Sequence, residues 1–216
     1  MHTVEIVDTA KKLREWFALC DNAGVVAVDT ETTSLDPITC DLVAVQLSVK
    51  VGEQYRACFI PVAMETCDNL DTDLVLDVLK PIFEGPQKKL FHNAGYDLQV
   101  LARYGSKVEN YHDSMVASFA LNSIKNNRRH GFDELVWHEF REITIEFGDI
   151  VNPALGVSNF AQVRLDHAAA YGCADVALIL KYWYEVARPE LNENEPLRDV
   201  YQNIDMPMVA VLAGMK

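Results

Sequence analysis

The chain has 216 residues, half of them apolar and 24% charged, which predicts a folded domain with one core and argues against a disordered chain. No stretch approaches the roughly 18 uninterrupted apolar residues of a membrane helix and no signal peptide opens the chain, so we expect a cytoplasmic protein with no membrane partner. Acidic residues outnumber basic ones by 32 to 19, and the net charge of −13 opposes a general electrostatic attraction to nucleic acid.

The predicted elements form an α/β pattern. A short strand over 4–7 precedes a helix whose apolar stripe includes Leu13, Trp16 and Cys20. The next elements are three β-rich runs that suggest a meander, then a helix, a strand and three further helices: 25–29, 42–49, 55–62, 74–84, 89–93, 96–105, 113–122 and 132–140. A long helix over 165–187 follows, and its length implies a central position. No repeat or linker divides the chain, so we expect a single domain.

Two carboxylates close the first β-rich run of the predicted sheet. Asp29 and Glu31 are two residues apart, so on a strand they point to the same face. Ligands collect at the carboxyl ends of strands in α/β sheets, which favours a functional interpretation. The alternative is chance, because a chain with this many acids contains several acid-x-acid triplets.

Two further pairs have helical spacing. Asn93 and Asp97 are four residues apart at the start of a helix, where the alternative for Asp97 is an acid that favours the helix dipole. Tyr171 and Asp175 share one face of the long helix. A carboxylate on this otherwise apolar helix is costly unless it is paired or bound to a metal.

Four acids from three segments can meet only if their repulsion is offset. That repulsion is about 4 kcal/mol per pair at about 4 Å with an effective dielectric constant of about 20. A set of oxygen ligands without Cys or His suits Mg²⁺ or Mn²⁺ rather than zinc. Two such cations about 4 Å apart stabilise the attacking and leaving oxygens of a phosphoryl displacement. The pattern therefore predicts phosphodiester hydrolysis.

The three motifs are DTE, NAGYD and YGCAD, at 29–31, 93–97 and 171–175. In this order they resemble the exonuclease motifs of the DnaQ-like superfamily, in its tyrosine-containing branch. The segments HNAGYDLQVLARYG, DSMVASFALNS and RRHGFDELV further resemble the proofreading domain of bacterial polymerase I type, family A DNA polymerases. The resemblance implies an RNase H-like mixed β-sheet flanked by helices, and a metal-dependent 3′-5′ exonuclease acting on DNA 3′ ends. The alternatives are a stand-alone nuclease that trims RNA 3′ ends and a catalytically silent domain that supports a polymerase.

The resemblance also implies catalytic roles. Asp29, Glu31 and Asp175 would bind one divalent cation, and Asp29 and Asp97 would engage the second. Tyr171 would orient the attacking water. The implied cofactors are two divalent cations, Mg²⁺ or Mn²⁺.

Substrate contacts are implied in the same way. They fall on Thr32, Leu35, Asn93 and Phe160, with Leu35 and Phe160 against the terminal bases. Ordinary packing is the alternative for Leu35 and Phe160. The sequence departs from the family at Gly95, where bacterial members often have Lys.

A basic loop follows the predicted helix over 113–122. Its residues Lys125, Arg128, Arg129 and His130 are candidates for phosphate contacts, and a solvated loop is the alternative.

The last residues, NIDMPMVAVLAGMK over 203–216, resemble the segment where such a proofreading domain joins a polymerase domain. We therefore expect an exonuclease domain over 1–200, and over 201–216 the start of the connection to a polymerase domain of the same parent chain. The expected partners are a single-stranded DNA 3′ end and that polymerase domain. The expected location is the cytoplasm, in association with the nucleoid.

Overall fold

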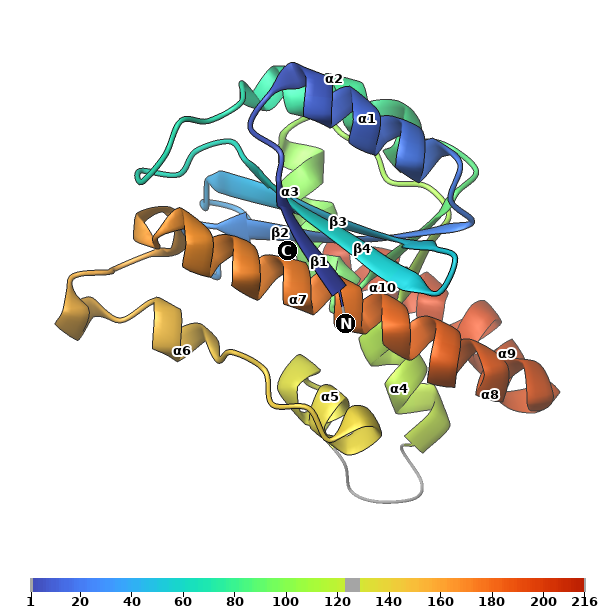
Figure 1. The fold of residues 1–216 in the computed structure, drawn as a ribbon. Helices are drawn as coiled ribbons and strands as arrows, with labels where there is room; N and C mark the ends of the chain where they lie inside the picture. Colours follow the sequence, from blue (N-terminus) through green and yellow to red (C-terminus); the bar gives the residue numbers. More distant parts are fainter. Residues whose placement is uncertain (1, 123–128, 216) are drawn as a thin grey trace.

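Six strands form one mixed β-sheet in the computed structural model, which describes residues 2–122 and 129–215 (Figure 1). The order across the sheet is β1-β4-β3-β2-β5-β6. β2, β3 and β4 pair antiparallel, whereas β1 pairs parallel with β4, β5 with β2, and β6 with β5. The strands are β1 His2–Ile6, β2 Val25–Thr32, β3 Leu42–Val51, β4 Gln54–Pro61, β5 Lys88–Phe91 and β6 Tyr111–Asp113. The predicted meander is confirmed.

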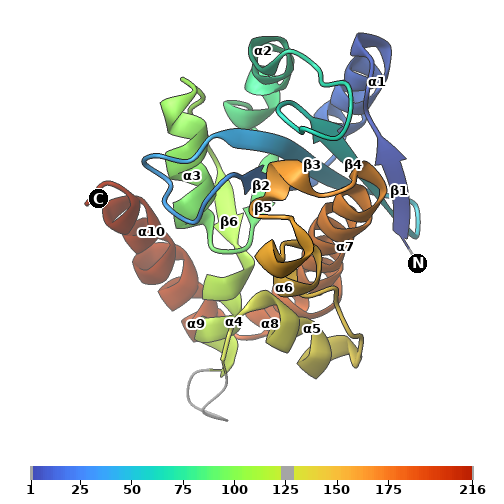
Figure 2. The ribbon, with the colours of Figure 1, turned by 90° about the vertical axis from the view of Figure 1, so that its left-hand side faces the viewer.

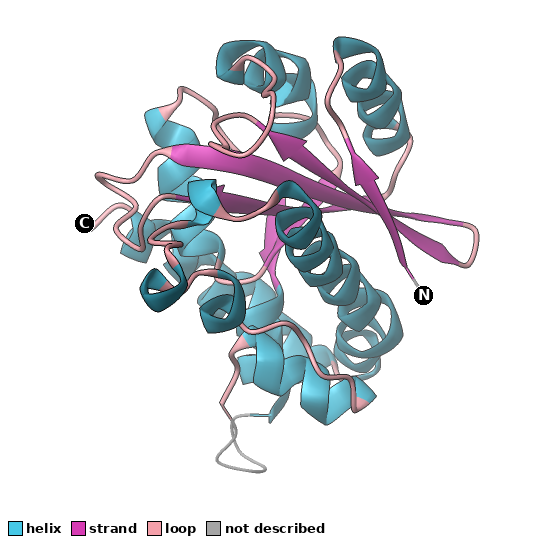
Figure 3. Ribbon diagram, turned by 60° about the vertical axis from the view of Figure 1, so that its left-hand side comes forward, coloured by secondary structure: helices cyan, strands magenta, loops and turns pink. Residues whose placement is uncertain are grey.

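Helices cover both faces of this sheet (Figure 3). α1 (Ala10–Asp21) and α2 (Thr72–Phe83) contact each other over one face, and α7 (Leu165–Tyr182) crosses the other face in contact with β1 to β4. The other α-helices are α3 Ala94–Arg103, α4 Ser114–Asn122, α5 Phe132–Phe140, α6 Phe147–Ile150, α8 Arg188–Glu193, α9 Glu195–Val200 and α10 Met206–Ala213. None of the helices within the described ranges has the length and apolar character needed to cross a membrane. The expected α/β architecture, a mixed sheet flanked by helices, is confirmed.

Local sequence explains how α1 forms. The side chain of Thr9 caps the helix by accepting a hydrogen bond from the backbone N of Lys12 at 3.3 Å. The apolar stripe is buried, with Leu13, Trp16 and Cys20 fully inaccessible to solvent. Burial of large apolar side chains stabilises the fold by about 1.5–3 kcal/mol each. The helix therefore packs on α2 and the sheet by one face.

Close approach of α7 to the sheet depends on a glycine. A Cβ atom added at Gly172 would lie 2.7 Å from Cγ of Gln46 on β3, which is closer than real Cβ contacts come. Glycine is the residue that permits a neighbouring side chain to approach the helix backbone this closely. The middle of α7 consequently packs directly against β2 and β3.

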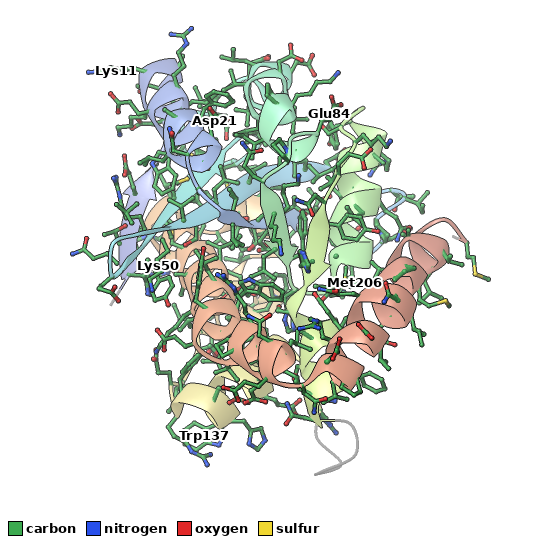
Figure 4. All side chains as sticks on the ribbon, turned by 90° about the vertical axis from the view of Figure 1, so that its right-hand side faces the viewer. Lys11, Asp21, Lys50, Glu84, Trp137 and Met206 are labelled. Atoms are coloured by element: carbon green, nitrogen blue, oxygen red, sulfur yellow. The ribbon has the colours of Figure 1, made fainter. Side chains whose placement is uncertain are left out.

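Two π-helical turns alter the predicted helices near the end of the chain. The turn Trp183–Ala187 continues α7, so the long helix expected over 165–187 is present with a change of hydrogen-bond register. The turn Tyr201–Asp205 leads into α10, which contacts α3 and whose first residue Met206 is marked in Figure 4. Tyr201 is fully buried and its hydroxyl lies 3.0 Å from Nδ1 of His112. The packed core of the domain therefore includes residues on both sides of residue 200.

Candidate active site

The three acidic segments meet at the end of β2, beside the N-terminus of α3 and the middle of α7 (Figure 2). Asp29 and Glu31 share one face of β2, Asp97 lies in the first turn of α3, and Asp175 lies in α7. Glu31, Asp97 and Asp175 are each less than one tenth exposed, and Asp29 is half-buried. Acidic side chains are rarely buried without partners, so this grouping marks a specialised site.

Asp97 is bonded directly to β2. Its Oδ1 atom accepts hydrogen bonds from the backbone N of Thr30 at 3.0 Å and from Oγ1 of Thr30 at 2.6 Å. Thr30 stands between Asp29 and Glu31, so the two bonds join α3 to the middle of the first acidic segment. The carboxylate of Asp97 therefore binds to β2, and its interactions go beyond a favourable contact with the dipole of its own helix.

Burial raises the pKa values of all four carboxyl groups, and repulsion from a neighbouring acid adds to the rise for three of them. Loss of hydration raises the pKa of Asp29 to about 7 and raises the pKa of Glu31, Asp97 and Asp175 well above the ordinary values. For these three residues the next cause is the negative charge of Asp29. The hydrogen bonds from Thr30 oppose the rise at Asp97. Full ionisation of this cluster near neutral pH needs compensating positive charge.

Tyr171 lies one turn before Asp175 and hydrogen bonds to it. Burial, followed by the charge of Asp175, raises the pKa of Tyr171 far above its ordinary value, so the phenol stays protonated at physiological pH. The ring packs against Phe147 and Phe160, with centroid separations of 6.4 and 6.0 Å. A protonated hydroxyl is thereby held beside the carboxylates as a hydrogen-bonding group.

A cavity of about 560 Å³ lies over the cluster, within the usual range for ligand sites. Most of the predicted site residues line it: Asp29, Glu31, Thr32, Leu35, Asn93, Tyr171 and Asp175. The remaining lining residues are Thr30, Thr33, Ser34, His92, Tyr96, Phe132, Phe147, Val151, Ser158, Asn159 and Ile179. Carboxylates and aromatic rings thus border the same space. Asp97 does not line the cavity and is joined to the other acids through its bonds to Thr30 of β2.

The loop after β2 is held against α3. The hydroxyl of Tyr96 hydrogen bonds with Oγ1 of Thr32 and donates to the carbonyl O of Ser34 at 2.7 Å. Leu35, the next residue, is 87% exposed. This exposure argues against the core-packing alternative for Leu35. The loop therefore presents an apolar side chain at the edge of the cavity.

Asn93 occupies a strained turn at the start of α3. Its φ angle of 69° lies in the left-handed region, which Asn tolerates better than most residues. The buried carboxylate of Asp113 accepts hydrogen bonds from the backbone N of Asn93 at 3.2 Å and of Ala94 at 2.7 Å. These bonds offset the strain and leave the Asn93 side chain exposed at the cavity.

Phe160 differs from its expected placement. The side chain is fully buried, does not line the cavity, and packs against Phe59, Phe147 and Tyr171 with centroid separations of 6.0–6.4 Å. Phe147 is 42% exposed and does line the cavity. Of these two rings, Phe147 is therefore the one that faces the cavity, and Phe160 packs against it from the core. Phe147 and Phe160 both precede the YGCAD motif in the sequence. Their different distances from the motif are the sequence feature that distinguishes them, and neither distance indicates which ring is exposed.

Two other aromatic side chains at the cavity were not expected from sequence. His92 directly precedes the NAGYD motif, and its Nδ1 atom lies 2.8 Å from Oγ of Ser114. Its ring packs edge-on against Phe132, with the centroids 5.8 Å apart. Burial lowers the pKa of His92 to about 4, so its imidazole is neutral near pH 7.

The basic loop lies partly outside the described residues, which include neither Lys125 nor Arg128. Nη1 of Arg129 lies 3.7 Å from Oε1 of Glu134, and Nδ1 of His130 lies 2.9 Å from Oγ of Ser118. The phosphate contacts considered for this loop therefore stay a prediction.

The carboxylates suit a divalent cation chemically. Oε1 of Glu31 is buried without a hydrogen-bond partner in the described part of the chain, and oxygen ligands are those that Mg²⁺ and Mn²⁺ prefer. Within the described ranges, no three His, Cys, Asp or Glu side chains are arranged to hold a metal ion as they stand. Because Oδ1 of Asp97 is occupied by Thr30, its Oδ2 atom is the one left for a ligand role. The four carboxylates are therefore close enough to influence one another's pKa, without forming a complete set of metal ligands as they stand.

Similarity to proteins of known structure supports this fold. The catalytic core of RRP6 from Trypanosoma brucei aligns with a TM-score of 0.70 at 20% identity, over 97% of this chain and 52% of that one. Brucella melitensis NrnC with bound Mg²⁺ aligns with a TM-score of 0.63 at 20% identity, over 99% of this chain and 92% of that one. These likenesses confirm the RNase H-like arrangement of sheet and helices.

Similarity in sequence identifies the family, which similarity in structure alone does not. The chain is 32% identical to DNA polymerase I of Chloroflexus aurantiacus over 99% of its length, and 33% identical to DNA polymerase I of Pseudomonas aeruginosa over 93%. It spans 22% of the length of each relative. A model of the 3′-5′ exonuclease family of DNA polymerase A matches residues 4–186, which include all three acidic motifs. The chain therefore belongs to the family of 3′-5′ exonuclease domains found in family A DNA polymerases.

Proposed function

We propose that this domain hydrolyses the terminal phosphodiester bond at the 3′ end of single-stranded DNA with two divalent cations, Mg²⁺ or Mn²⁺. The observation that carries the proposal is the cluster of Asp29, Glu31, Asp97 and Asp175 beside a cavity, with the pKa of each carboxyl group raised. A polyanionic substrate cannot approach four ionised acids without compensating charge. Cations shared between the acids and the phosphate supply that charge.

The carboxylates divide into two overlapping ligand sets. Asp29, Glu31 and Asp175 would hold one cation, and Asp29 and Asp97 would hold the second. When bound, such cations stabilise the charge on the attacking and leaving oxygens of an in-line displacement.

Tyr171 has a separate role in positioning the attacking water. Its phenol stays protonated, so it orients the water by hydrogen bonding and does not remove the proton. The water oxygen bonds to phosphorus while the bond from phosphorus to the 3′ oxygen of the preceding nucleotide breaks. The proton that the water loses passes to solvent, and the departing 3′ oxygen takes a proton from solvent to become a hydroxyl. The products are a nucleoside 5′-monophosphate and a strand shortened by one nucleotide.

The other cavity residues would bind the substrate. Leu35 and Phe147 offer apolar and aromatic surface to the terminal bases, in contacts worth about 1–3 kcal/mol per base. Thr32 and Asn93 offer polar groups to the sugar and phosphate. Phe160, which the sequence pattern indicates for base contact, takes the supporting position behind Phe147 and Tyr171.

The relatives support a role in DNA proofreading. Both are named DNA polymerase I, and each is several times longer than this chain. We infer that residues 1–200 form an exonuclease domain and that 201–216 begin its connection to a polymerase domain in the same parent chain. Such a domain would remove mismatched nucleotides from a primer end in the cytoplasm, at the nucleoid.

A digestion experiment tests this function. The domain is incubated with 5′-labelled and 3′-labelled single strands of DNA and RNA while Mg²⁺ or Mn²⁺ is titrated. We expect stepwise shortening of DNA from the 3′ end, dependent on the cation, and loss of most activity in Asp29→Ala. The control is Asp77→Ala, which removes an exposed acid on α2. Preference for RNA, or near-normal digestion by Asp29→Ala, would contradict the proposal.

A further inference from the structure

Gln46 is a buried amide without hydrogen bonds. It lies in the middle of β3, its side chain is fully inaccessible to solvent, and neither Oε1 nor Nε2 has a hydrogen-bond partner among the described residues. Buried side-chain amides are nearly always satisfied, because an unpaired buried donor or acceptor destabilises the fold. A methionine or leucine would fill the same space without that cost. The presence of an amide at this position therefore needs an explanation.

The position of Gln46 relates it to the carboxylate cluster. In the antiparallel ladder it is directly opposite Asp29 on β2, so the two side chains leave the sheet on the same face. Directly opposite residues have Cβ atoms about 4.5–5.5 Å apart, which is within the reach of a glutamine amide. On the other side, a Cβ atom added at Gly172 would lie 2.9 Å from Nε2 of Gln46. The amide thus lies between Asp29 and the turn of α7 that follows Tyr171.

A neighbouring residue shows that polar groups on this face of β3 are otherwise satisfied. Ser48 is two residues further along the strand, and it is also fully buried. Its hydroxyl donates a hydrogen bond to the carbonyl O of Arg56 at 2.9 Å. The unsatisfied amide is therefore a property of the position opposite Asp29 and not of the strand as a whole.

Asp29 lacks a side-chain donor in the described part of the chain. The backbone N–H of Thr30, which donates to Asp97, also lowers the pKa of Asp29 and is the one group that opposes the effect of burial on it. Carboxylates that bind a metal are usually fixed by hydrogen bonds from a second layer of residues. A neutral amide can supply such a bond without adding a fifth negative charge to the cluster and without a positive charge that would compete with a cation.

We propose that Gln46 is a positioning residue, which donates its amide N–H to the carboxylate of Asp29 and so orders the ligand that both cations share. The inference rests on the proposed function, because it concerns the cation-bound form of the site. In that form the amide N–H has a hydrogen-bond partner, and the burial of Gln46 is explained. Gly172 contributes by leaving room for the amide beneath α7.

The test compares Gln46→Met and Gln46→Leu with Ser48→Ala as the matched control on the same face of β3. Binding of Mn²⁺ is measured without nucleic acid, by calorimetry and by the rise of the unfolding midpoint as Mn²⁺ is added. We expect both Gln46 variants to bind Mn²⁺ about 10–100-fold more weakly than the wild type. Their midpoint in EDTA should be unchanged or higher, because an unpaired buried group has been removed. Ser48→Ala should lower the EDTA midpoint and leave the Mn²⁺ affinity unchanged.

The dependence of digestion on Mn²⁺ gives a second measurement. We expect the Gln46 variants to need about 10–100-fold more Mn²⁺ for half-maximal rate and to approach the wild-type rate at saturation. Wild-type Mn²⁺ affinity in both variants would overturn the inference and leave the proposed function intact. Failure of both variants to fold would also overturn it, by showing that the amide stabilises the metal-free core. Absence of any Mn²⁺ effect on the wild type would instead overturn the proposed function itself.

Discussion

Thr30 donates two hydrogen bonds to one oxygen of Asp97, from its backbone N at 3.0 Å and from its Oγ1 atom at 2.6 Å. The contact spans 67 residues of sequence and joins the strand that carries Asp29 and Glu31 to the helix that carries Asp97. The relative positions of these acids are therefore fixed by a direct bond. Because the bonds favour the ionised form of Asp97, they also oppose the rise of its pKa on burial.

Thr30→Val should raise the pKa of Asp97 further. The variant retains the shape of the side chain and the backbone donor but loses the hydroxyl donor, a bond to a charged group worth about 1.5–3 kcal/mol. The acid limb of the pH–rate profile should then move upwards by about 1–2 pH units. Thr30→Ser keeps the hydroxyl and should retain the wild-type profile. An unchanged profile in Thr30→Val would show that the hydroxyl bond does not affect the titration of Asp97.

Metal-free protein should become less stable as the pH rises through the range in which Asp29 titrates. The pKa of Asp29 is about 7 in the folded protein, against an ordinary value of 3.8 that applies to the unfolded chain. Between these values the folded state holds a proton that the unfolded state has lost, so the free energy of unfolding falls with pH from about 4 to about 7. Asp29→Asn should remove this contribution to the fall of the free energy of unfolding with pH.

The measurement is the free energy of unfolding from denaturant titrations in EDTA, from pH 4.5 to 8, for the wild type, Asp29→Asn and Asp77→Asn. We expect the wild type to lose stability relative to Asp29→Asn across the range, and Asp77→Asn to follow the wild type. Added Mg²⁺ or Mn²⁺ should restore wild-type stability at the upper end, because it binds the ionised acids. Parallel curves for the wild type and Asp29→Asn would contradict the raised pKa of Asp29.

Much of the fold could be predicted because local signals determine it. Buried strands such as β2 and β3 each begin with four consecutive apolar residues, VVAV and LVAV, and the stripe on α1 has helical spacing. The acidic motifs could also be placed, since each lies in or directly after an element whose type is clear from its pattern. The catalytic carboxylates predicted from sequence, Asp29, Glu31, Asp97 and Asp175, do gather at one end of β2.

What could not be predicted depends on contacts between distant segments. Periodicity does not reveal that Thr30 would bond Asp97, or that Gln46 would be buried opposite Asp29. The burial of Phe160 and the exposure of Phe147 have the same origin, because both lie in short helical turns between α5 and α7, where no pattern determines burial. Side-chain exposure in such a stretch follows from tertiary packing.

Tyr171→Phe should slow digestion without weakening cation binding. The variant keeps the ring that packs on Phe147 and Phe160 and removes the hydroxyl that would orient the water. We expect the rate at saturating DNA and cation to fall by up to about 100-fold, at the lower end of the range for lost proton-transfer and positioning groups. Mn²⁺ affinity, measured by calorimetry, should match that of the wild type. An unchanged rate would assign Tyr171 to packing alone.

Phe147 and Phe160 should respond differently to truncation. Phe160→Ala removes a fully buried ring and should lower the free energy of unfolding by about 3–5 kcal/mol. Phe147→Ala removes a ring that is 42% exposed at the cavity, and should cost much less stability. Its main effect should be on binding, because stacking on a terminal base is worth about 1–3 kcal/mol. The KM for short single strands should therefore rise by about 5–150-fold, with a smaller change in kcat.

The measurements are denaturant unfolding for stability and initial rates on oligonucleotides of one length for KM and kcat. Leu35→Ala is the companion variant, since Leu35 is 87% exposed and its truncation should affect KM without a measurable loss of stability. The increase in KM should be similar for different terminal bases, because stacking and apolar contact do not depend on base identity. A stable Phe160→Ala variant with a raised KM, together with a normal KM in Phe147→Ala, would return the base contact to Phe160. It would also show that the cavity opens further around Phe160 when the strand binds.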